Sequence, residues 1–104
     1  NEQKYVQECI ETGWVSSVGS FVDRFSKDLR TQTGLYAVPV VNGTAALHLC
    51  LHLAGVQPGE EVLTPSLTFV ATANAVAYCG AQPHFMDCKA ERFSLDLDRL
   101  EDQN

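Results

Sequence analysis

One stretch of the sequence has the residue types of a phosphate-binding turn. It reads Val-Val-Asn-Gly-Thr-Ala-Ala-Leu over residues 40–47, where an apolar run passes through a glycine into an alanine-rich segment. A helix that begins here has free backbone N–H groups and the positive end of its dipole, and both favour a bound phosphate. Thr44 adds a hydroxyl donor, and the small Ala45 lets a ligand approach the backbone. The alternative is that Asn42 or Thr44 simply caps the helix.

A pair of histidines follows on the same expected helix and raises the question of a metal site. His48 and His52 are four residues apart, the spacing of two ligands on one helix face. A metalloprotease helix would carry Glu at position 49, where this chain has Leu49, and no third ligand follows. We therefore expect no metal, and we expect the pair to form a polar stripe near the phosphate-binding turn or at a subunit contact.

Four cysteines are present, but their spacings match neither a zinc ribbon nor a redox pair. Cys50 and Cys79 lie within apolar helical stretches, where a thiol packs as a small hydrophobic group. We expect buried, reduced thiols and no disulfide.

The elements that position these residues alternate between strand and helix. The apolar runs and turn signals predict strands over residues 36–41, 61–64 and 82–86, with helices over residues 44–54 and 69–79. Such alternation predicts an α/β fold of βαβ units, with a parallel sheet and helices on both faces. A further helix is expected to start within residues 94–98, where the first turn is acidic.

The first 34 residues have a different pattern. Apolar residues recur at helical spacing up to Gly13, and a second amphipathic stretch runs from about Ser20 to Gly34. We therefore divide the chain into a helical entry segment, residues 1–34, and an incomplete α/β part, residues 35–104.

Composition and charge exclude several classes of protein. The 104 residues are 45% hydrophobic, enough apolar surface for a folded core. Seven Lys and Arg against thirteen Asp and Glu give a net charge of −6, which argues against a nucleic-acid partner. No apolar run is long enough to cross a bilayer, so no membrane role is expected. The polar first eleven residues have no secretory signal pattern, and we expect a cytoplasmic protein.

Nearly the whole chain resembles one enzyme family. The run VVNGTAALHLCLHLAGVQPGEEVLTPSLTFVATANAVAYCGAQPHFMDC and the upstream TGWVSSVGSFVDRF are similar to the amino-terminal portion of the DegT/DnrJ/EryC1/StrS aminotransferases. The resemblance implies part of the large domain of a fold-type-I enzyme, with pyridoxal 5'-phosphate as cofactor. It also implies a homodimer that transfers an amino group from an amino acid, with glutamate expected, to a nucleotide-linked keto-sugar for bacterial surface polysaccharides.

The resemblance also assigns cofactor-binding residues. The Gly-Thr-Ala step of the family binds the cofactor phosphate through backbone amides and the Thr hydroxyl, and it falls on Gly43, Thr44 and Ala45. The aromatic residue of the family's Pro-x-x-Thr-aromatic motif stacks on the pyridine ring, and it falls on Phe69. Without the motif, Phe69 would be taken for a core aromatic at a helix start.

The resemblance also bears on several other positions. Trp14 and Ser16 match a segment near the substrate entrance of the family, although Trp14 could equally pack against the second helix. The family usually has Phe-Glu where this chain has Phe25 and Ser26, which removes any role of that acid. Asp87 is interpreted as a carboxylate that orders the following loop.

The residues that perform transamination are not among those matched. The reaction needs a lysine that holds the cofactor and an acid that keeps the pyridine nitrogen protonated, and in the family both lie further along the chain. Lys4, Lys27 and Lys89 do not match the lysine motif and are interpreted as solvated. We therefore assign no catalytic residue. The alternative to a piece of a transferase is a truncated, non-catalytic module that self-associates through exposed apolar helix faces.

Overall fold

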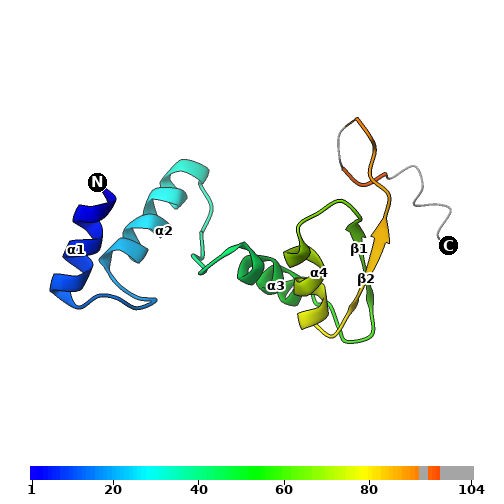
Figure 1. The fold of residues 1–104 in the computed structure, drawn as a ribbon. Coiled ribbons are helices and arrows are strands. Elements are labelled where there is room, and N and C mark those ends of the chain that lie inside the picture. The colour runs from blue at the N-terminus through cyan, green and yellow to red at the C-terminus, as the bar shows by residue number, and fades with distance from the viewer. Residues whose placement is uncertain (92–93, 97–104) are drawn as a thin grey trace. The chain divides into compact units, whose positions relative to one another are not determined.

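The computed structural model describes residues 1–91 and 94–96, and Figure 1 shows its helices and strands. In chain order these are α1 (Glu2–Thr12), α2 (Ser20–Thr33), α3 (Gly43–Leu53), β1 (Glu61–Pro65), α4 (Val70–Tyr78) and β2 (Gln82–Met86). The contacts divide the chain into two compact units, Asn1–Pro39 and Val40–Asn104.

The first unit consists of α1, α2 and the segments around them. Each helix ends at a glycine in the left-handed conformation, Gly13 and Gly34, both with φ of 74°. These are the stop positions expected from the sequence, because glycine adopts this conformation without a steric penalty. The rings of Tyr5 and Phe21 meet edge to face at 5.3 Å and join the two helices.

The second unit contains the α/β part of the chain. Strands β1 and β2 pair in parallel, from Glu61 opposite Gln82 to Pro65 opposite Met86, and α4 connects them. Helix α4 packs against both strands, and α3 packs against α4 (Figure 1). This is the parallel βαβ arrangement predicted from the sequence. The small core of this unit consists of the buried residues Thr64, Ala75, Val76, Ala81 and Met86.

The strand predicted over residues 36–41 is not formed, which corrects the sequence interpretation. The segment has no strand assignment, and no described strand pairs with it. Val41 is 89% exposed and Val38 is 75% exposed, so no described element buries these two side chains. A strand needs hydrogen bonds to a neighbouring strand, and β-propensity along one segment cannot supply that neighbour. The described residues therefore form one βαβ unit, where two were expected.

The helix start expected within residues 94–98 is also wrong in its described part. Leu95 forms an isolated antiparallel bridge with Cys88, which makes this segment extended. Lys89, expected to be solvated, has its ammonium group 3.6 Å from a carboxylate oxygen of Asp96. The remainder of the expected helix lies outside the described residues.

The cysteines are unbridged, and none of them is fully buried. All four are free thiols, and Cys50 is exposed while the other three are half-buried. The expectation of burial is therefore wrong for Cys50 and only partly met for the other three, because an apolar helix is covered only where another element packs on it. In residues 1–91 and 94–96, no helix has the length and apolar character needed to span a bilayer.

Candidate cofactor site

The start of α3 is capped by the residue that precedes it. Asn42 has an extended backbone, with φ of −162° and ψ of 173°, and its side-chain oxygen accepts a hydrogen bond from the Ala45 amide at 2.9 Å. The Asn42 carbonyl accepts from the Ala46 amide at 3.2 Å. This is the arrangement of a helix N-cap, in which the side chain replaces one missing hydrogen-bond acceptor.

Two amide groups at this helix end stay open. The backbone N–H groups of Gly43 and Thr44 donate to no described residue, and the Thr44 hydroxyl likewise makes no hydrogen bond within the described chain. Gly43 is exposed, and a Cβ atom built on it meets nothing within 4 Å. The first turn of α3 therefore presents two amide donors, one hydroxyl and the positive end of the helix dipole to open space.

Phe69 stands immediately before α4, where it occupies the N-cap position with φ of −70° and ψ of 142°. Its carbonyl accepts from the Thr72 amide at 3.0 Å, and its ring is 78% exposed. The neighbouring hydroxyls of Thr68 and Thr72 lie 2.9 Å apart and share a hydrogen bond. The ring is thus outside the described core, with its faces available for stacking on a flat ligand.

Trp14 and Ser16 belong to the other unit, Asn1–Pro39. The indole of Trp14 is 55% exposed and lies against the backbone at Gly19, where an added Cβ would be 3.4 Å from the Trp14 Cβ. Ser16 accepts a hydrogen bond from the Val18 amide at 3.3 Å. The loop therefore has a local structure of its own, and the role of both residues in substrate binding stays a prediction.

Two of the three histidines, His48 and His84, have partners that the sequence did not indicate. His48 packs edge to face against Tyr78 of α4, with ring centroids 5.6 Å apart. Among the described residues, no group of three or more His, Cys, Asp and Glu side chains could hold a metal ion. His84 Nδ1 lies 2.9 Å from the Glu61 carboxylate, across the two parallel strands. Only the strand register brings these two residues together, since they are 23 positions apart.

Comparison with known proteins identifies the family. The model of the DegT/DnrJ/EryC1/StrS aminotransferase family matches residues 1–103. The chain belongs to this family. Across the chain, the resemblance stated from the sequence motifs is therefore confirmed, as is the partial α/β fold of this enzyme class.

Several relatives are close in sequence or structure. GDP-perosamine synthase of Caulobacter vibrioides is 48% identical over 102 residues, which cover 97% of this chain and 28% of the relative. A protein of Streptococcus pneumoniae assigned as a sugar aminotransferase, in its PMP form, superposes with a TM-score of 0.87 at 31% identity, covering 99% of this chain and 26% of that one. NtdA of Bacillus subtilis, with bound cofactor PMP, has a TM-score of 0.85 at 32% identity, covering 96% and 23%.

These comparisons identify the cofactor of the relatives and show how much of a relative's length this chain covers. The Streptococcus pneumoniae protein has also been solved in its PLP form, so pyridoxal phosphate is the cofactor of the relatives. The chain spans about 28% of the length of the GDP-perosamine synthase that it matches.

Proposed function

We propose that this chain is the amino-terminal part of a pyridoxal-phosphate-dependent sugar aminotransferase and that it forms part of the cofactor seat. The observation that carries the proposal is the open first turn of α3, where the amides of Gly43 and Thr44 have no partner among the described residues. A phosphate group is the ligand that best suits such a helix end, because it accepts several N–H donors and carries negative charge.

The described residues fit the cofactor. Gly43 and Thr44 would bind its phosphate, and the open space beside the Gly43 Cα would admit the phosphate oxygens. Asn42 holds the first turn of α3 in place by accepting from Ala45, so the amide predicted as the third phosphate donor is already engaged. Phe69 would fix the plane of the pyridine ring by stacking. When bound, the cofactor supplies an electron sink for amino transfer.

The substrate we propose is a GDP-linked keto-sugar, aminated at the expense of an amino acid such as glutamate. Support comes from the 48% identity with the GDP-perosamine synthase of Caulobacter vibrioides, because that name specifies a GDP-linked amino sugar. We also propose that Trp14, with its exposed indole, contacts the sugar or the nucleotide. The working enzyme is proposed to be a cytoplasmic homodimer, as the family resemblance implies.

A titration with PMP tests the cofactor seat directly. PMP has an amine in place of the aldehyde, so it cannot react with lysine side chains and reports non-covalent binding only. In amide NMR spectra of the chain, we expect saturable shifts at Gly43 and Thr44, and weaker binding by Thr44→Val. Thr31→Val is the matched control, because Thr31 is an exposed helical threonine that bonds only to the Lys27 carbonyl. Absence of shifts at Gly43 and Thr44 would contradict the proposed seat.

The non-catalytic alternative is tested separately. If the coding sequence continues beyond Asn104 with the family's lysine and acid, the protein that it encodes should transfer the amino group of glutamate to a GDP-linked keto-sugar. A stop codon at that point, together with stable self-association of the chain in sedimentation experiments, would favour the non-catalytic module instead.

A further inference from the structure

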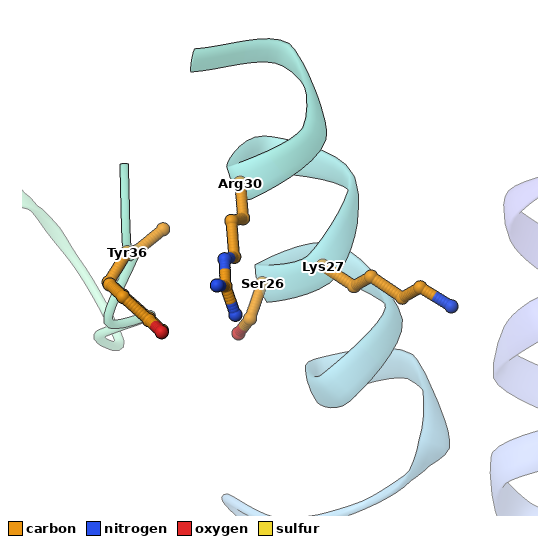
Figure 2. A pocket seen from close by; sticks show the side chains of 5 residues that line it. Ser26, Lys27, Arg30 and Tyr36 are labelled. Carbon is orange, nitrogen blue, oxygen red and sulfur yellow. The ribbon is translucent and has the colours of Figure 1, made fainter. Parts of the chain in front are cut away.

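A hollow lies in the unit Asn1–Pro39. It has a volume of about 240 Å³ and lies between the carboxyl half of α2 and the segment that follows that helix. Figure 2 shows its lining, which consists of Ser26, Lys27, Arg30, Tyr36 and Ala37. Its two cationic side chains are those of Lys27 and Arg30.

Arg30 lies over the exposed ring of Tyr36. The central guanidinium carbon lies 3.9 Å from the centroid of the tyrosine ring. A guanidinium that stacks on an aromatic face keeps its N–H donors in its own plane, so the stack orients the group without consuming its hydrogen bonds. In Figure 2 the guanidinium and the Tyr36 hydroxyl extend toward the same end of the hollow. The N–H donors of the Arg30 guanidinium are therefore oriented in advance, with the Tyr36 hydroxyl beside them as a further donor.

The charge of Arg30 is not balanced within the described chain. No carboxylate among residues 1–91 and 94–96 is within ion-pair distance of Arg30 or of Lys27. Arg24, six residues earlier on the same helix, does have such a partner, because its Nε is 3.7 Å from the Asp28 carboxylate. Arg30 and Lys27 therefore leave positive charge beside the hollow.

The Lys27 and Ser26 side chains contribute less to recognition in the hollow. The Lys27 ammonium extends away from Tyr36 in Figure 2, so it adds positive potential and no contact. The Ser26 hydroxyl donates to the Val22 carbonyl at 3.0 Å, so its proton is already used. Recognition therefore depends on Arg30 and Tyr36.

We propose that this hollow binds a phosphate group through the guanidinium of Arg30, with the Tyr36 hydroxyl as a second donor. Phosphate oxygens match the planar fork of an arginine in a bidentate arrangement, and the hollow is large enough for one such group. The phosphate can come from free phosphate or from a nucleoside diphosphate. The proposal does not depend on the cofactor seat at α3, which lies in the other unit.

The test is a titration of the isotope-labelled chain with inorganic phosphate and, separately, with GDP, followed through the Arg30 side-chain Nε–H signal. We expect a saturable shift of that signal. Arg30→Gln should weaken binding at least about tenfold, the scale of a lost charge-assisted hydrogen bond. Arg24→Gln is the matched control, which removes the same charge from the same helix and should leave binding within about twofold. Tyr36→Phe keeps the stack and should weaken binding less than Tyr36→Leu.

The possible outcomes separate the explanations. Equal affinity for phosphate and GDP supports a site for phosphate alone, and tighter binding of GDP supports a nucleoside diphosphate as the occupant. Equal weakening by Arg30→Gln and Arg24→Gln would overturn the proposal, because net charge alone would then account for binding. Shifts confined to the Gly43 and Thr44 amides would also overturn it and would leave the cofactor seat intact. Arg30→Lys keeps the charge and serves as a second variant if Arg30→Gln misfolds. Far-UV circular dichroism checks the fold of each variant.

Discussion

The side-chain oxygen of Asn42 lies 2.9 Å from the amide nitrogen of Ala45 and closes the first turn of α3. The cap satisfies one amide of that turn and leaves those of Gly43 and Thr44 open. Capping and ligand binding, which the sequence presented as alternatives, are therefore compatible at this helix end. Asn42 fixes where the helix starts, and the two amides after it would supply the donors for the proposed phosphate.

Removing the cap should destabilise the second unit. We expect Asn42→Ala to lower the free energy of unfolding by about 1 kcal/mol, because the Ala45 amide loses its acceptor. Urea unfolding followed by far-UV circular dichroism measures the change. Asn42→Asp keeps an acceptor oxygen and should unfold close to the unmodified chain. Equal losses in the two variants would show that the cap bond is not the cause.

A substitution at Gly43 should weaken cofactor binding without lowering the stability of the chain. In Gly43→Ala the new methyl group meets nothing within 4 Å, and alanine is a better helix former, so stability should be unchanged or higher by about 0.5 kcal/mol. The same methyl group occupies the space that phosphate oxygens would use, so PMP binding should weaken roughly tenfold. Titration calorimetry measures this, with Cys50→Ala on the same helix as control. Unchanged PMP affinity would place the phosphate elsewhere.

Two glycines with similar backbones should differ in their tolerance of alanine. Gly80 and Gly55 have φ of 74° and 88°, so alanine at either position costs about 1 kcal/mol of backbone strain. At Gly80 the new Cβ would also lie 3.1 Å from the Pro58 Cβ, whereas at Gly55 it meets open space. Gly80→Ala should therefore be the more destabilising by about 1 kcal/mol in thermal unfolding. Equal losses would mean that the Pro58 turn moves aside freely.

The loop that holds Trp14 should depend on Gly19. This residue has φ of 150°, which favours glycine, and Trp14 lies against it. We expect Gly19→Ala to cost about 1–3 kcal/mol of local strain and to shift the indole further into water. Trp14 is the single tryptophan, so a red shift of its fluorescence reports the change. Ser17→Ala in the same loop is the control, and identical spectra for Gly19→Ala and the unmodified chain would refute the packing role.

Local features of the sequence were enough to predict most helices and two of the strands. Gly13 and Gly34 end their helices because left-handed glycine is a local property of the chain. The strands at residues 61–65 and 82–86 were predicted within one residue, because each apolar run is bounded by turn residues. The Gly-Thr pair after Asn42 could be recognised as a candidate phosphate seat for the same reason.

The contacts between residues of different elements were decided by the tertiary structure alone. The pairing of Glu61 with His84 requires the parallel register of two strands, and the stack of Arg30 on Tyr36 requires the turn that follows α2. The segment 36–41 has the residues of a strand but finds no described partner, because strand formation depends on a neighbour that the segment does not encode. Helix ends and turns are set by nearby backbone, whereas strand pairing and side-chain stacking are set by how the chain folds back on itself.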